Sequence, residues 1–161
     1  YETEDFKSAE AYASKVLNNS KADKKVKADA QVIVARAAIQ INDTATAKKA
    51  YADLLSNATG EIAAEALYYD AYFKNADKKF DASNTAVQKL AKDYSGYKYY
   101  GAKGLVLMAK NFYGLKDSYQ ATYILESVIK NFTDYSDVVS EAKAELSKIK
   151  SEESKRNSSV K

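Results

Sequence analysis

The sequence predicts an all-α fold in which antiparallel helix pairs follow one another as a solenoid. Proline is absent and glycine occurs only five times in 161 residues, so the residues on which sheets, hairpins and long loops depend are scarce. Apolar residues recur with the 3.6-residue spacing of helices, and the alternation typical of strands is nowhere sustained. A third observation, a recurring interval between small residues, predicts how the helices are organised.

Small residues at the start of the core-facing stripes recur at a nearly constant interval. One series consists of Ala9, Ala47, Ser83 and Ala121, and a second, interleaved series consists of Ala28, Ala64 and Ala102. Successive residues of each series are about as far apart in the sequence as one repeat unit of a helix-pair repeat protein, which is a few tens of residues long. Because the two series interleave, each repeat is expected to contain two helices.

Short polar breaks between the stripes predict eight helices. In chain order we expect them at residues 3–18, 23–41, 44–56, 61–75, 79–93, 97–114, 118–132 and 136–154. Helix–turn–helix joints are expected within repeats, at residues 42–44, 77–79 and 116–118. The breaks between repeats contain the Asn, Ser, Asp and Gly that favour helix caps and ends, and they lie at residues 18–20, 57–60, 93–96 and 134–137.

The elements form one predicted domain, residues 1–154. The first helix aligns with the second helix of a repeat, so residues 1–20 are a half repeat that lacks its first helix. Full repeats follow at residues 21–58, 59–95 and 96–134. The helix at 136–154 has one apolar stripe and is charged elsewhere, which is typical of a cap that closes a stack. The tail at 155–161 has no apolar period and is predicted to be flexible.

The last full repeat has apolar residues at regular positions in both of its helices: Leu105, Met108, Ala109 and Phe112 in the first, and Ala121, Leu125 and Val128 in the second. This pattern resembles that of the tetratricopeptide repeat family. The repeat at 21–58 matches at Ala35 and Ala47, where small side chains let helix axes approach to about 8–10 Å. The middle repeat departs from the pattern at Asp70 and Lys74, and the family's proline is absent. The resemblance implies a right-handed superhelix of about three and a half repeats plus the C-terminal capping helix.

Family members hold an extended or helical segment of a partner in a concave groove lined by the first helices. Carried onto this sequence, the resemblance implies the following groove residues: Arg36, Gln40, Tyr68, Tyr72, Asn75, Lys103, Lys110 and Tyr113. Lys, Arg and Tyr suit an acidic or carboxylate-bearing segment. The basic and amide clamp of chaperone-binding members is not matched, because Val32, Tyr68 and Val106 occupy its positions. We therefore expect a non-catalytic protein–protein interaction scaffold; the alternative is a regulatory or oligomerisation domain attached to an enzyme or signalling protein.

The composition argues against catalysis, cofactors and nucleic acid. With no Cys and no His, the usual ligands of zinc and haem and the commonest general base are missing. No phosphate-binding loop, dinucleotide fingerprint or calcium loop occurs. The net charge of +3 is mild and the acids are interspersed with the lysines, unlike a nucleic-acid-binding surface. Most of the 14 tyrosines are expected to pack between helices.

The remaining expectations concern compartment and assembly. No apolar run approaches the roughly 18 residues of a membrane span. Lys-rich, Arg-poor, Tyr- and Asn-rich usage, together with the closing helix, resembles repeat proteins of Gram-negative envelopes, which implies the periplasm or cell envelope; the cytoplasm is the alternative. The half repeat leaves one flank of the first helix without a partner. We expect either that the chain is the C-terminal end of a longer array or that it forms a homodimer through this end.

Overall fold

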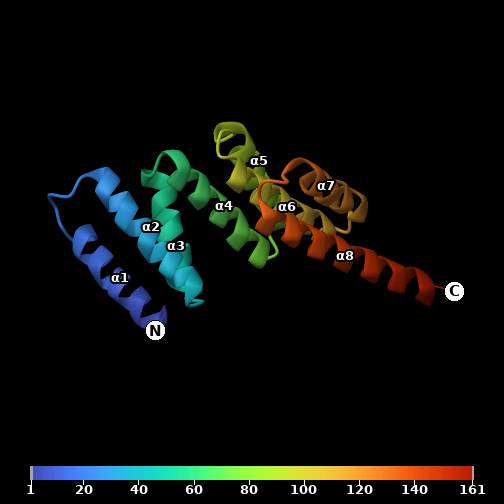
Figure 1. The fold of residues 1–161 in the computed structure, drawn as a ribbon, viewed down its shortest axis with the longest axis horizontal. Helices are drawn as coiled ribbons and strands as arrows, with labels where there is room; N and C mark the ends of the chain where they lie inside the picture. Colours follow the sequence, from blue (N-terminus) through green and yellow to red (C-terminus); the bar gives the residue numbers. More distant parts are fainter. Residues whose placement is uncertain (1, 161) are drawn as a thin grey trace. The chain divides into compact units, whose positions relative to one another are not determined.

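The structure, a computed structural model, describes residues 2–160, with side chains from Asp5 onward. In this part of the chain there are eight α-helices and no strands, which confirms the predicted all-α fold. The helices are α1 (Glu2–Leu17), α2 (Lys24–Gln40), α3 (Thr44–Asn57), α4 (Gly60–Ala76), α5 (Phe80–Asp93), α6 (Lys98–Gly114), α7 (Ser118–Asn131) and α8 (Ser136–Ser159) (Figure 1).

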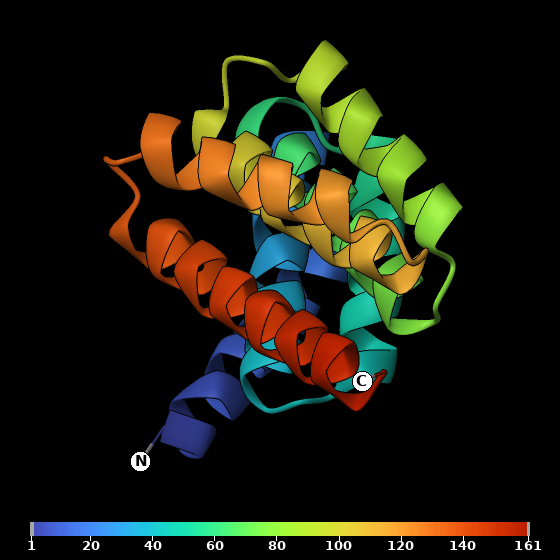
Figure 2. The same cartoon turned by 90° about the vertical axis from the view of Figure 1, so that its right-hand side faces the viewer.

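The chain divides into two compact units, one up to Asp70 and one from Ala71, so the division falls within α4. In the first unit α1 packs on α2, and α2 packs on α3. In the second unit α5 packs on α6, α6 on α7, and α8 on both α7 and α6. Figure 2 shows α7 (orange) and α8 (red) side by side. Within each unit, successive helices thus pack on one another, as expected for consecutive helix pairs.

The turns within the helix pairs have the same backbone geometry at three places. Asn42, Lys78 and Lys116 lie in the left-handed region, with φ of 59°, 60° and 68°, and they recur once in each predicted full repeat. The same six-to-one hydrogen bond of 2.8 Å follows each of them, from the backbone N of Asp43 to the O of Ala38, from Lys79 to Lys74 and from Asp117 to Phe112. This bond is that of the Schellman motif, which satisfies carbonyls at a helix end. The helix–turn–helix joints predicted from the period are therefore a recurring structure.

Two of these left-handed positions carry an exposed lysine, from which a stability prediction follows. A side chain with a Cβ disfavours this conformation by about 1–2 kcal/mol, whereas glycine adopts it freely but loses more backbone entropy on folding. We expect Lys78→Gly and Lys116→Gly each to raise the free energy of unfolding by about 0.5–1 kcal/mol, measured by urea denaturation. The control Lys49→Gly, inside α3, should lower it by about 1 kcal/mol. If all three glycine substitutions lower the free energy of unfolding equally, the left-handed conformation of Lys78 and Lys116 is contradicted.

Most of the predicted small residues are buried, whereas Ala9 and Ala28 are half-buried. Ala35, Ala47, Ala109 and Ala121 are all 0% exposed. In the second unit Ala109 and Ala121 belong to a buried cluster from α6, α7 and α8: Ala102, Val106, Ala109, Ala121, Leu125, Val128, Val138, Ala142 and Ile149. Small side chains at these positions allow helix axes to approach one another.

The last helix is longer than the sequence predicts. It continues to Ser159, so the predicted helix end at 154 is too early and most of the predicted tail is helical. These residues are polar all round, and local interactions support them: Arg156 lies 3.4 Å from Glu153 one turn earlier, and the Ser158 and Ser159 hydroxyls donate to backbone carbonyls of the preceding turn. Hydrophobic periodicity does not detect such a helical segment, because the segment has no apolar face.

Candidate binding surface on the first helices

The residues predicted to line a groove lie on α2, α4 and α6, the first helices of the predicted full repeats, and they divide between the two units. The first unit contains Arg36, Gln40 and Tyr68. The second unit contains Tyr72, Asn75, Lys103, Lys110 and Tyr113.

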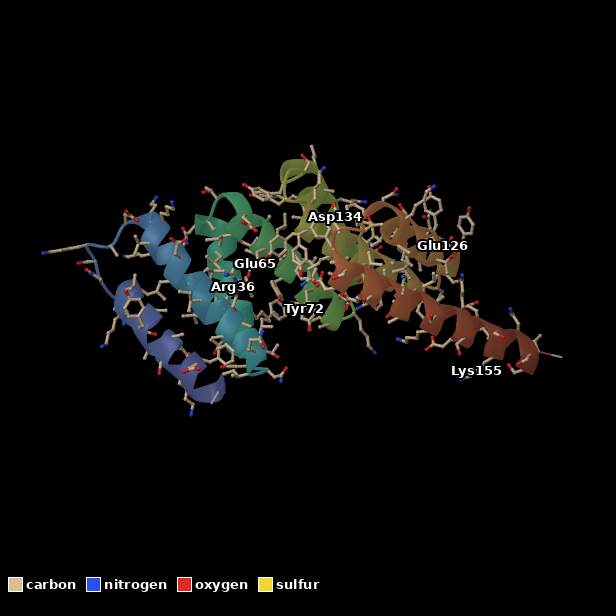
Figure 3. The ribbon with its side chains drawn as sticks, in the orientation of Figure 1. Arg36, Glu65, Tyr72, Glu126, Asp134 and Lys155 are labelled. Atoms are coloured by element: carbon tan, nitrogen blue, oxygen red, sulfur yellow. The ribbon has the colours of Figure 1, made fainter. Side chains whose placement is uncertain are left out.

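In the first unit Arg36 binds a buried carboxylate (Figure 3). Its Nε donates to Glu65 Oε1 at 2.9 Å and its Nη2 donates to Glu65 Oε2 at 2.6 Å, a two-point geometry that only arginine offers. Glu65 is 2% exposed, and Tyr51 Oη donates to its Oε1 at 2.8 Å. A buried charge needs such partners because desolvation of the carboxylate would otherwise be very unfavourable. Arg36, predicted to bind a partner, thus holds α2 to α4.

Aromatic packing surrounds this ion pair. Burial, followed by the negative charge of Glu65, raises the pKa of Tyr51 well above that of an ordinary tyrosine, so its hydroxyl stays a donor. The Tyr51 ring stacks on Tyr69 with centroids 4.3 Å apart, and Tyr69 meets Tyr68 edge to face at 5.0 Å. Tyr68 is only 6% exposed, so it packs inside the fold and offers little surface to a partner. Gln40 is exposed.

In the second unit one face of α6 holds three carboxylates of α8. Tyr99 Oη donates to Asp137 Oδ2 at 2.6 Å, Lys110 Nζ lies 2.8 Å from Glu141 Oε1, and Tyr113 Oη donates to Glu152. Lys103 lies on the same face, with its Nζ 5.6 Å from the centroid of the Tyr99 ring, within reach of a cation–π interaction. Three of the predicted residues, Lys103, Lys110 and Tyr113, therefore lie on a face that binds carboxylates within the chain.

The electrostatics of this face favour ionised acids. The hydrogen bond from Tyr99 lowers the pKa of Asp137, and the charge of Lys103 lowers it further. Acceptance by Glu152 raises the pKa of Tyr113, because losing the proton would place two negative charges together. The first shift keeps the Asp137 carboxylate charged, and the second keeps the Tyr113 hydroxyl protonated.

The Tyr99–Asp137 bond predicts a measurable titration. In Tyr99→Phe the pKa of Asp137 should rise towards that of an ordinary aspartate, read from the carboxyl ¹³C shift against pH. Because folding lowers this pKa, the bond stabilises the fold above the unfolded-state pKa, and the stabilisation is lost as pH falls through the folded value. Tyr119→Phe, at a side chain 77% exposed on α7, is the control and should leave Asp137 unchanged. If the pKa of Asp137 is the same in Tyr99→Phe as in the parent, the hydrogen bond from Tyr99 does not lower it.

A buried polar network joins α4, α5 and α6 in the second unit. Asn111 is 0% exposed; its Nδ2 donates to Ser83 Oγ and Asn84 Oδ1, both at 2.8 Å, and its Oδ1 accepts from Asn75 at 2.7 Å. Ser83 Oγ donates in turn to the Ala71 carbonyl at 2.7 Å. Asn75, predicted as a groove residue, therefore anchors this network.

The other predicted residue of α4 in this unit is Tyr72. Its side chain is 43% exposed, and its ring meets the Phe73 ring edge to face at 5.5 Å. Tyr72 therefore keeps part of its surface open to a partner, unlike Tyr68.

For Asn111 and for two of the three carboxylates bound by α6, the sequence contains a signal that the spacing within single helices does not reveal; Lys110 and Glu141, 31 residues apart, do not follow it. Asn75 and Asn111 are 36 residues apart, Tyr99 and Asp137 are 38 residues apart, and Tyr113 and Glu152 are 39 residues apart. These separations are close to one repeat. Helix faces one repeat apart lie next to each other in stacked helix pairs, so complementary residues at this spacing indicate links between neighbouring first helices.

In the part of the chain described by the structure, no group of acidic side chains is arranged to hold a metal ion. Among the described helices, none is long and apolar enough to cross a bilayer.

Comparison with protein-family models, with curated proteins and with solved structures gives no match. The consecutive helix pairs and the carboxylate-binding face of α6 are therefore the basis for assigning a function.

Proposed function

We propose that the chain is a non-catalytic protein–protein interaction scaffold of the tetratricopeptide repeat type, with about three and a half repeats in a right-handed superhelix and α8 as its cap. Its first helices hold an acidic segment of a partner protein. The observation that carries this proposal is the face of α6 on which Tyr99, Lys110 and Tyr113 already bind three carboxylates of a neighbouring helix.

The ion pairs between α6 and α8 contribute less free energy than the apolar burial of α8. This difference supports replacement of the α8 carboxylates on α6 by those of a partner. The Lys110 and Glu141 side chains are 32% and 42% exposed, and ion pairs this open contribute about 0–1 kcal/mol each. By contrast, Val138 and Ile149 of α8 are 1% and 0% exposed, and burying each such side chain contributes about 1.5–3 kcal/mol. Apolar burial therefore holds α8 in place, and the polar pairs can rearrange around a partner's acids without releasing the helix.

Peptide selection tests this proposal. Display of a random peptide library against the whole chain should enrich acidic sequences, whose affinities are then measured by calorimetry. Lys103→Glu/Lys110→Glu should weaken binding of a selected peptide at least about tenfold, equivalent to about 1.4 kcal/mol, and the matching Gln variant should weaken it less because it adds no repulsion. The control is Lys49→Glu on α3, where the side chain is 82% exposed; it should bind normally.

Two outcomes would refute the proposal: enrichment of peptides without acidic residues, or unchanged binding by the double Glu variant. Far-UV circular dichroism and the melting temperature of each variant must match those of the parent closely enough to exclude unfolding as the cause of weaker binding. Affinity for a polyanion that falls steeply with added salt would instead favour a nucleic-acid function.

A further inference from the structure

A hollow of about 490 Å³ lies in the second unit between two inter-repeat turns, the turn from α5 to α6 and the turn from α7 to α8. Four aromatic residues, Tyr94, Tyr97, Phe132 and Tyr135, belong to its lining. The polar lining residues are Ser95, Lys98, Asn131 and Asp134. Asp134 is labelled in Figure 3, in the turn before α8. The volume is in the range of sites that hold small organic ligands.

The hollow itself is a product of the repeat. A hollow of about 320 Å³ in the first unit is lined by residues that lie two repeats earlier in the sequence. Lys24 there corresponds to Lys98, and Asn57 corresponds to Asn131. No aromatic residue lines the hollow of the first unit among the residues that the structure describes. The repeated fold therefore explains where the hollow lies, whereas the aromatic lining distinguishes the hollow of the second unit from that of the first.

Two of the four rings occupy N-cap positions, where a small polar residue would stabilise a helix better. The N-cap of α2 is Asp23, whose carboxylate accepts from the Val26 amide at 2.8 Å. The equivalent N-cap of α6 is Tyr97, which makes no capping bond, and the N-cap of α8 is Tyr135, which makes none either. Asp, Asn, Ser and Thr are the preferred residues at this position. Tyr135 gains packing in return, because its ring meets the Tyr99 ring edge to face at 5.5 Å and packs against the buried cluster of the second unit. Tyr97 is 36% exposed and its ring meets Tyr94 at the hollow, so core packing does not explain its presence. Residues that break a local rule without a structural gain are expected at functional sites.

The chemistry of the lining selects a class of ligand. The Tyr94 and Tyr97 rings are 6.4 Å apart and tilted by 44°, so they form an angled apolar surface. Lys98 and Asp134 balance each other in charge, which disfavours selection of either an anion or a cation. Among the described residues, neither Lys98 nor Asp134 forms an ion pair. Hydroxyl, amide, ammonium and carboxylate groups together supply both donors and acceptors.

We propose that this hollow is a binding site for a neutral saccharide. The C–H face of a sugar ring would pack on the Tyr97 and Tyr94 rings, as apolar surface packs on aromatic side chains generally. Its hydroxyls would bond to Ser95, Asn131 and Asp134. The lining residues differ from those that bind carboxylates on α6, although the Tyr135 ring of the hollow meets the Tyr99 ring of that face at 5.5 Å. Occupancy of the hollow does not depend on the protein-binding role proposed above.

The test uses the whole ¹⁵N-labelled chain and four neutral trisaccharides: maltotriose, cellotriose, mannotriose and N,N′,N″-triacetylchitotriose. At least one should shift the amide resonances of residues 94–98 and 131–135 with a dissociation constant of about 1 mM. Tyr97→Asn should weaken this binding about tenfold or more. The same substitution places a preferred residue at the N-cap, so the melting temperature should stay the same or rise by about 2–4 °C. Tyr119→Asn, at an exposed tyrosine of α7, should bind like the parent.

Loss of binding without loss of stability in Tyr97→Asn separates a ligand-binding role from a packing role. The proposal is overturned if none of the four trisaccharides shifts these resonances, or if Tyr97→Asn binds as well as the parent. It is equally overturned if tetramethylammonium shifts the same resonances in an Asp134-dependent way while the sugars do not, because the site would then be an aromatic cage for cations. None of these outcomes bears on the acidic-peptide test.

Discussion

Replacing Arg36 with Ala is expected to lower the free energy of unfolding by about 3 kcal/mol. The substitution removes two hydrogen bonds from the Glu65 carboxylate, whose side chain is 3% exposed, while the Tyr51 hydroxyl still donates to it. Removing one partner of a buried ion pair typically destabilises by about 3–5 kcal/mol, because the other charge stays buried without its counter-charge. The Arg36 side chain is 57% exposed, so water can replace part of the interaction, and the lower end of that range applies.

Urea denaturation followed by circular dichroism measures this effect. The double variant Arg36→Ala/Glu65→Leu should be more stable than Arg36→Ala alone, since it removes the stranded charge together with its partner. Lys49→Ala breaks an exposed pair with Asp53 at 3.4 Å and should change stability by less than about 0.5 kcal/mol. If Arg36→Ala has an effect as small as that of Lys49→Ala, the buried pair is not a main link between α2 and α4.

Ala47→Leu should destabilise the chain by about 1–3 kcal/mol, because Ala47 is 0% exposed in the packed face of α3. Extra methylene groups in a close-packed interior force neighbouring side chains and backbone apart. Ala52, on the same helix, is exposed, and Ala52→Leu is the matched control, with an expected change within about 0.5 kcal/mol. Thermal or urea unfolding of the two variants side by side gives the difference.

This comparison tests the reason for the repeat's small residues. The helix propensities of Ala and Leu are similar, so a difference between the two sites comes from packing. Equal stabilities of Ala47→Leu and Ala52→Leu would mean that close helix approach does not depend on a small side chain at position 47.

Helix positions are predictable from the sequence because the repeat imposes the same pattern several times. The predicted joints at 42–44, 77–79 and 116–118 coincide with turns that share one hydrogen-bond pattern. The end of α8 is not predictable in this way, since its last turns bury almost nothing and depend on contacts such as that of Glu153 with Arg156. Periodicity detects burial, and a polar helix extension has none.

The candidate site is predicted less completely than the fold. Helical spacing alone places Lys103, Lys110 and Tyr113 on one face, but it does not identify their acceptors on α8. Arg36 is predicted to bind a carboxylate, and it does so, yet this carboxylate belongs to Glu65 of the same chain. Whether a charged side chain binds within the chain or outside it depends on which helices pack together, and the periodicity of a single helix does not contain that information.

The decisive experiment on the proposed binding role of α6 is to map a selected acidic peptide onto the chain by nuclear magnetic resonance. We expect the largest amide and side-chain shifts in the second unit on α6 at Lys103, Lys110 and Tyr113, with smaller shifts at their α8 partners. Shifts centred instead on Tyr119 and Tyr123, the tyrosines of α7 that are 77% and 64% exposed, with α6 unaffected, would contradict it.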